Sequence, residues 1–352
     1  MIVGADVSHP GVGSVSHCPS VAAVVASCDK NAAKFLGSLR LQSSKQEMIE
    51  AFDQMIVERL RVWYEENKSL PNAILVYRDG VSESQFAAVK TEELLKIKSG
   101  CEKAGKAHNV TGYSPNITIV VCGKRHRTRF LPASKPIPDE ERALDKNKNH
   151  LPGLVVDDPQ IRSPWHYDFY LQSQRALKGT ARPCHYFVIE NQMTLNANQL
   201  QAITYNLCWI FATALTPISY AAPAYYADRL ADRGRCYLRP LLVLNHPERP
   251  SETTLLSGMP NRNDATEDEK DTHVCNLITN GWKNLWPAQN GGSPQKDEVA
   301  RTMFYVQMSR QPSRPLLCFY ELNSLHSHSL INLLKTYNLM SLSRCTLRSA
   351  FE

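Results

Sequence analysis

Several signals of secreted and membrane-bound proteins are missing from this 352-residue sequence. The ten cysteines are scattered and include no C-x-x-C pair, which argues against a zinc ribbon or a disulfide framework. No basic segment followed by an apolar one stands at the start. The least polar stretch, 207–227, is interrupted by Thr, Pro, Ser and Tyr, so no membrane-spanning helix is expected. We therefore expect reduced thiols, no membrane association, and a location in the cytoplasm or also in the nucleus.

The composition is that of a globular protein. Hydrophobic residues make up 43% of the chain, which is enough for the core of one large domain or two ordinary ones. The formal net charge is only +6, but Lys124, Arg125, Arg127 and Arg129 concentrate positive charge in one short segment. Clustered cations favour a polyanionic partner.

The spacing of apolar residues predicts an α/β fold. Runs rich in Val, Ala and Leu predict three antiparallel strands at 2–7, 20–27 and 34–41. Apolar residues then recur at helical spacing from Ser44 to Trp63, and Ser44 with Glu47 has the form of a capping box at the start of this helix. A second helix is expected from Ser82 to about 103. Further strands are expected at 73–77, 117–122, 153–156 and 185–189, a long surface loop at 131–152, and two closing helices at 198–214 and 223–237.

Six short phrases occur in a fixed order along the chain. They are GADVSHP at 4–10, YRDGVSE at 77–83, KRH at 124–126, DFYL at 168–171, GTARP at 179–183 and PAYYA at 223–227. Together they make the chain resemble the PIWI domain of eukaryotic Argonaute proteins. The resemblance implies an RNase H-like fold, a mixed sheet flanked by helices, over residues 1–306. It also implies that the chain is a fragment, because Argonautes carry upstream domains that hold the guide.

The resemblance assigns a catalytic tetrad to Asp6, Glu47, Asp79 and Asp228, with the three aspartates as metal ligands. Two-metal cleavage of a phosphodiester needs hard oxygen ligands, which favours two Mg²⁺ ions, with Mn²⁺ as a substitute. Structural alternatives exist for each acid. Asp6 and Asp79 could be ordinary strand-end residues, Asp228 a surface residue, and Glu47 the acceptor of the capping box. The acids are far apart in sequence, so the family resemblance alone brings them together.

The resemblance also implies that small guide RNA and a complementary target RNA are partners, along with silencing-complex proteins. It places Lys124 near the guide's 5′ phosphate, and the candidate guide contacts are Lys124, Arg125, Arg182, Ser219, Tyr225 and Arg233. For these residues the alternative is a solvated basic surface. The chain departs from many relatives at Gln174, Thr213 and Cys236, which weakens the list of contacts but not the metal site.

Three functions follow from these observations. The first is a guide-directed endoribonuclease, and the second is a guide-binding silencing module that does not cut. A third, another RNase H-like enzyme such as a transposase, leaves the YRDGVSE and KRH phrases unexplained. Residues 307–352 match nothing in the family, so we expect an atypical tail outside the domain, either a gene-model artefact or a lineage-specific appendix.

Overall fold

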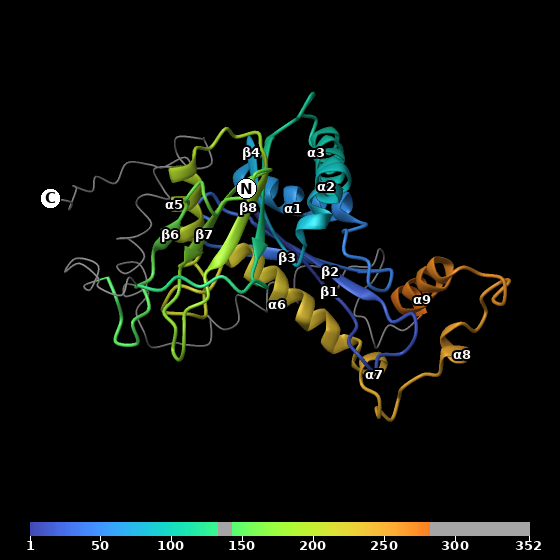
Figure 1. The fold of residues 1–352 in the computed structure, drawn as a ribbon. Coiled ribbons are helices and arrows are strands. Elements are labelled where there is room, and N and C mark those ends of the chain that lie inside the picture. The colour runs from blue at the N-terminus through green and yellow to red at the C-terminus, as the bar shows by residue number, and fades with distance from the viewer. Residues whose placement is uncertain (133–142, 282–352) are drawn as a thin grey trace, which may run out of the picture.

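The computed structural model describes residues 1–132 and 143–281 (Figure 1). Its centre is an eight-stranded sheet in the order β3-β2-β1-β4-β5-β8-β7-β6. The strands are β1 Ile2–Ser8, β2 Ser20–Ser27, β3 Phe35–Gln42, β4 Ala73–Asp79, β5 Asn116–Gly123, β6 Leu154–Val156, β7 Tyr167–Gln172 and β8 Cys184–Asn191. The β1–β4 and β4–β5 pairs are parallel and the other pairs are antiparallel, as expected for a mixed sheet.

Helices cover both faces of the sheet (Figure 1). The helices α1 (Phe52–Asn67), α2 (Phe86–Ala88) and α3 (Leu94–Ala107) pack on one face, and α5 (Ala197–Leu207) and α6 (Ala222–Tyr237) pack on the other. Side chains alternate between the faces of a strand, so Val3 and Ala5 of β1 join the α1 layer while Ile2 joins the α6 layer. Within the described ranges, no helix is long and apolar enough to cross a bilayer.

The predicted start of the first helix is wrong. It begins at Phe52 rather than at Ser44, and the residues before it form an irregular segment. Lys45 has a left-handed backbone conformation with φ of 62°, which interrupts a helix. The side-chain amide of Gln42 donates to the carbonyl oxygens of Gln46 and Met48, so these carbonyls bond to a side chain rather than to the N–H groups of a helix. Glu47 is therefore not a helix-capping residue.

The helix predicted at 198–214 is shorter in the structure, and tertiary contacts explain why. Helix α5 ends at Leu207 rather than near 214. Beyond it, the Tyr226 hydroxyl accepts from the Ala212 N–H and donates to the Ile210 carbonyl, so these backbone groups are bonded to a side chain of α6 rather than within a helix. Strand β7 was not predicted as a strand. Both predicted closing helices are present as α5 and α6, but they do not close the domain: up to residue 281, α7 (Arg239–Leu242), α8 (Glu252–Leu255) and α9 (Glu267–Gly281) follow.

The second helix starts at Ser82 as predicted, and Ser82 with Gln85 forms a capping box there. That helix continues through a π-helical turn at Val89–Glu93 and ends at Ala107, slightly beyond the predicted end. Part of the predicted loop at 131–152 and all of the predicted tail at 307–352 lie outside the described residues.

Candidate functional site

Asp6 and Asp79 lie side by side at the carboxyl ends of two parallel strands. The register pairs Gly4 of β1 with Tyr77 of β4 and Ala5 with Arg78, so the next step along both strands brings Asp6 beside Asp79. Side chains two positions apart on a strand point to the same face of the sheet. Asp79 therefore points, like Tyr77, to the face covered by α6, and Asp6 points there like Ile2. Both acids are buried. Sheet topology therefore joins two acids that are distant in sequence.

Helix α6 adds Asp228 to this pair, and a close approach of backbones makes this placement possible. A Cβ atom at Gly4 would lie 1.9 Å from the carbonyl oxygen of Pro223, so only glycine lets the start of α6 pack against β1. Asp228 is half-buried on the same helix. Burial raises its pKa; Lys124 opposes that rise and Asp79 adds to it. Asp228 thus belongs to the same electrostatic site as Asp79.

Glu47 reaches the site from the irregular segment before α1. A Cβ atom at Gly80 would lie 3.2 Å from both Oδ1 of Asp6 and Oε1 of Glu47, so these two oxygens flank the turn after Asp79. His9 holds the other carboxylate oxygen, with 2.7 Å between its Nε2 and Oε2 of Glu47. Oε1 is buried without a hydrogen bond, although it lies 3.0 Å from Nη2 of Arg78 as an ion pair. The structure therefore places Asp6, Glu47 and Asp79 around one turn, with Asp228 on the helix that covers this face of the sheet.

A buried ion pair anchors the Glu47 segment. Arg78 is fully buried, and its Nε lies 3.1 Å from Oε2 of Glu93, a residue of the π-helical turn. The same guanidinium donates to the Glu47 carbonyl at 2.6 Å, and Oε1 of Glu93 accepts from the Ile49 N–H at 2.9 Å. Sequence reasoning did not assign roles to His9, Arg78 or Glu93. The first two lie within the quoted phrases, whereas Glu93 carried no signal in the sequence.

The site holds more negative than positive charge. Burial, and then the carboxylate of Asp79, raise the pKa of Asp6 to about 8, although Arg78 opposes this rise. Nζ of Lys124 lies 2.6 Å from Oδ2 of Asp79 and 3.7 Å from the ring centroid of Tyr220. Burial lowers the pKa of Lys124, but the attraction of Asp79, together with that of Asp228, leaves that pKa raised. The ammonium of Lys124 is thus a counter-ion inside the acidic site.

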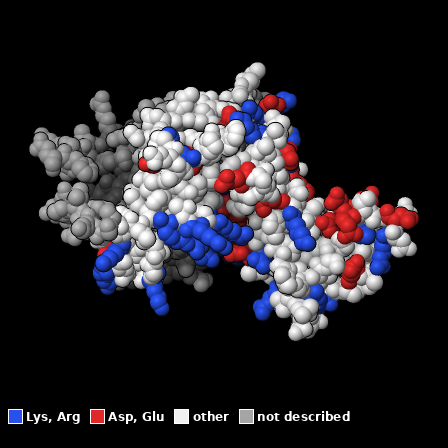
Figure 2. Space-filling view, viewed as in Figure 1, with Lys and Arg blue, Asp and Glu red and all other residues white. Residues whose placement is uncertain are grey.

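The expected contact of Lys124 with the guide's 5′ phosphate stays a prediction. The other candidate RNA contacts lie outside the cluster of acids. Arg125 and Arg182 are exposed, Ser219 is half-buried, and Nε of Arg233 donates to the hydroxyl of Tyr237 at 3.2 Å. The hydroxyl of Tyr225 accepts from Nη2 of Arg229 at 2.7 Å. Lys and Arg side chains form a band beside acidic side chains on the face shown in Figure 2.

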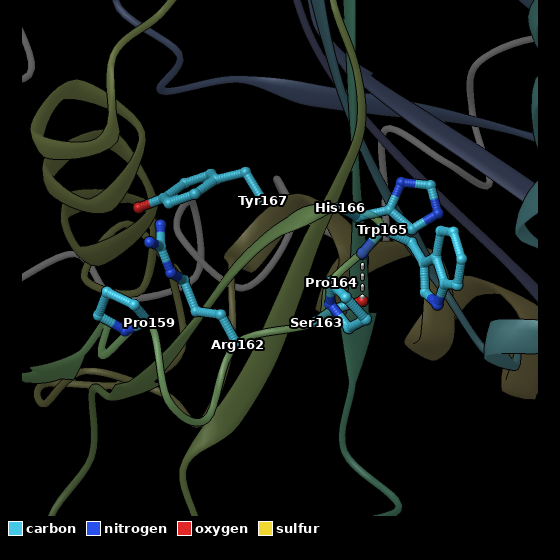
Figure 3. A pocket seen from close by; sticks show the side chains of 7 residues that line it. All are labelled: Pro159, Arg162, Ser163, Pro164, Trp165, His166 and Tyr167. Carbon is cyan, nitrogen blue, oxygen red and sulfur yellow. Dashed lines mark hydrogen bonds between the residues drawn. The ribbon is translucent and has the colours of Figure 1, made fainter.

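The acids converge without forming a closed ligand set. Among the described residues, no three His, Cys, Asp or Glu side chains are close enough together to hold a metal ion. A separate pocket of about 400 Å³ lies before and at the start of β7, where Arg162, Trp165 and Tyr167 contribute to its lining (Figure 3). That pocket includes none of the four acids.

The sequence model of the Piwi domain matches residues 1–239. The chain belongs to the Piwi domain family. This Piwi domain is 42% identical over 237 residues to protein argonaute 2 of Oryza sativa subsp. japonica, covering 67% of this chain and 22% of the rice protein. It is 41% identical over 238 residues to protein argonaute-2 of Drosophila melanogaster, covering 68% of this chain and 18% of the fly protein. The chain thus spans about a fifth of the length of these relatives.

The fold of this Piwi domain is similar to two solved Argonaute structures. One is the C-terminal lobe of a budding yeast Argonaute, with a TM-score of 0.62 and 34% identity over 68% of this chain and 47% of that chain. The other is Kluyveromyces polysporus Argonaute with a guide RNA, with the same TM-score and identity over 68% of this chain and 28% of that chain. The predicted family and the predicted RNase H-like fold are therefore confirmed.

Proposed function

We propose that this Piwi domain is a small-RNA-guided endoribonuclease that cleaves target RNA in RNA silencing. The observation that carries the proposal is the convergence of Asp6, Glu47, Asp79 and Asp228 at one end of the β1–β4 pair. Four acids gathered from two strands, an irregular segment and a helix are costly to bury together, and such clusters are typical of functional sites. Relatives described as argonautes, one of them solved with a guide RNA, support RNA as the partner.

The residues present fit Mg²⁺ chemistry, because proteins usually bind this ion through one or two carboxylates and leave the other positions to water and substrate phosphate; we infer two such ions. Asp6, Asp79 and Asp228 offer the hard oxygen ligands that Mg²⁺ prefers, and Mn²⁺ could replace it. The buried Oε1 of Glu47 has no hydrogen-bond partner, and the raised pKa of Asp6 indicates a deficit of positive charge. When bound, two such ions supply Lewis acidity at the scissile phosphate.

The chain's own residues would prepare the site for this reaction. His9 and Arg78 orient the Glu47 carboxylate toward Asp6, where Oε1, ion-paired with Arg78 but without a hydrogen bond, can accept one from water. Lys124 neutralises part of the acidic charge until a cation or a phosphate replaces that contact. The exposed cations Arg125 and Arg182 would contact the RNA backbone, while base pairing with the guide would select the target.

A cleavage assay with a matched variant tests this function. The full chain is given a 5′-phosphorylated guide RNA and a complementary target in Mg²⁺, and the products are examined for 5′-phosphate and 3′-hydroxyl ends. Asp79→Ala should abolish cutting and leave guide binding nearly unchanged, because backbone contacts elsewhere supply that affinity. Asp232→Ala, an exposed acid on α6, should cut normally.

The ion pair between Lys124 and Asp79 favours a second candidate function, a guide-binding module that does not cut. Cutting by the wild-type chain that is lost in Asp79→Ala would exclude this alternative. Guide binding without any cutting in Mg²⁺ or Mn²⁺ would instead establish it.

A further inference from the structure

Distant side chains hold the segment that carries Glu47. The segment lies between β3 and α1, and Lys45 within it has a left-handed backbone. Two consecutive backbone N–H groups near its start are satisfied from outside. Ser44 donates to Oδ2 of Asp271 at 2.9 Å, and Lys45 donates to Oγ of Ser20 at 2.9 Å. These two acceptors tie the backbone of the segment to other parts of the fold, so their positions help to decide where the segment lies.

Asp271 belongs to α9, beyond the residues that the Piwi domain model matches. Its side chain is only 12% exposed, and Nδ1 of His17 lies 2.7 Å from its Oδ1. The ring of His17 is itself 6% exposed and lies in the loop between β1 and β2. One carboxylate therefore joins α9, this loop and the Glu47 segment. Hydrogen bonds to an ionised acceptor are stronger than those between neutral groups.

The helix that presents Asp271 is fixed by its own apolar face. Val274 and Ile278 follow Asp271 at helical spacing, and both are fully buried in the core layer that includes α6. Helix α9 also contacts β3, the strand from which the Glu47 segment departs (Figure 1). The Val15 N–H in the β1–β2 loop donates to the Leu241 carbonyl of α7 at 2.9 Å. The residues after α6 thus contact both the β1–β2 loop and the Glu47 segment, which are the two segments that Asp271 connects.

We propose that Asp271 is a positioning residue and that α9 is a brace that keeps Glu47 inserted in the acidic site. This inference rests on the proposed nuclease function for its effect on cleavage, but the brace itself does not depend on that function. Glu47 lies three positions after Ser44 along the chain, a span of at most about 10 Å. A change in the anchor at Ser44 therefore reaches the carboxylate directly. Undocking of α9 would remove the anchor at Ser44 and leave Glu47 held only from the other side, by His9 and Arg78, while Asp6 and Asp79 stay in place.

Amide hydrogen exchange of the full chain tests the brace without requiring cleavage. Asp271→Ala should accelerate exchange of the Ser44 N–H about 10-fold, the factor that about 1.4 kcal/mol produces. Asp271→Asn keeps one acceptor oxygen and should give a smaller acceleration, and it replaces the alanine variant if that variant does not fold. Asp268→Ala, an exposed acid one turn earlier on α9, should leave this exchange unchanged. Unchanged exchange in both Asp271 variants would overturn the proposal.

A double-mutant comparison tests the link to Glu47. In the guided cleavage assay, Asp271→Ala should lower kcat about 10-fold and leave guide binding unchanged. Glu47→Ala and the double variant Glu47→Ala/Asp271→Ala should cut at the same residual rate, because Asp271 acts through Glu47. A further loss in the double variant would show a general structural role and overturn the assignment. A wild-type chain that does not cut would refute the nuclease proposal. The hydrogen-exchange result would still decide whether Asp271 and α9 hold the Glu47 segment in place.

Discussion

Replacing Asp6 with asparagine should stabilise the metal-free protein at neutral and alkaline pH. Burial, and then the Asp79 carboxylate, raise the pKa of Asp6 from 3.8 to about 8. The pKa of Asp6 is therefore higher in the folded protein than in the unfolded chain. The protonated carboxyl contributes its full stability at a pH below the pKa of the unfolded chain. This contribution is then lost as the pH rises through the folded pKa. Each pKa unit corresponds to about 1.4 kcal/mol, so the loss by pH 7 is roughly 2–4 kcal/mol once coupling among the acids is allowed for.

Urea denaturation in EDTA between pH 4 and pH 8 measures this effect. The free energy of unfolding of the wild type should fall by that amount with rising pH, whereas Asp6→Asn, which has nearly the same shape and no charge, should give a flatter profile. The control Asp232→Asn removes an exposed acid from α6 and should follow the wild type. Added Mg²⁺ should stabilise the wild type at pH 8 and have little effect on Asp6→Asn. Parallel pH profiles of the wild type and Asp6→Asn would refute the reasoning.

Other substitutions test the elements that build the site. Gly4→Ala should destabilise the fold by about 3 kcal/mol in urea denaturation, because its methyl group meets a backbone carbonyl of α6, whereas Gly11→Ala, which faces open space, should be neutral. Glu93→Gln should cost about 1.5–3 kcal/mol, because it removes one of the two charged partners of the buried Arg78 guanidinium, and the exposed Glu92→Gln is its control; equal stabilities would contradict the anchoring role. Lys124→Gln should raise Mg²⁺ affinity severalfold by calorimetry, because it removes a competing cation, and an unchanged affinity would contradict this.

The sequence predicted the strands more accurately than the segments between them. Ser20–Ser27 was predicted with its observed bounds, because a buried strand rich in Val and Ala has a clear local pattern. The apolar residues Met48 and Ile49 looked helical but are buried in an irregular segment, which a local pattern does not distinguish from a helix. Tertiary contacts from Gln42 and Glu93 decide the conformation there.

Family resemblance predicted the acids of the site, but their partners required the structure. Asp6 and Asp79 have no sequence signal for their proximity apart from the quoted phrases, and the parallel register explains it. The ion pair of Lys124 with Asp79 was not predicted, because the sequence of a basic segment does not show which cation turns inward. The contact of Asp271 with Ser44 joins residues at opposite ends of the described chain and was equally invisible.

The packing of α6 against β1 also has a consequence for the order in which the molecule forms. Asp6 and Asp79 can meet once β4 has paired with β1, but Asp228 comes from a helix near the other end of the described chain. Contacts of such large sequence separation form late, because the entropy of closing the intervening loop opposes them. In a chain synthesised from its N-terminus, three of the four acids precede Asp228 by a long stretch of translation. A complete set of acids is therefore a property of the finished fold, and a truncated or half-folded chain would present only part of it.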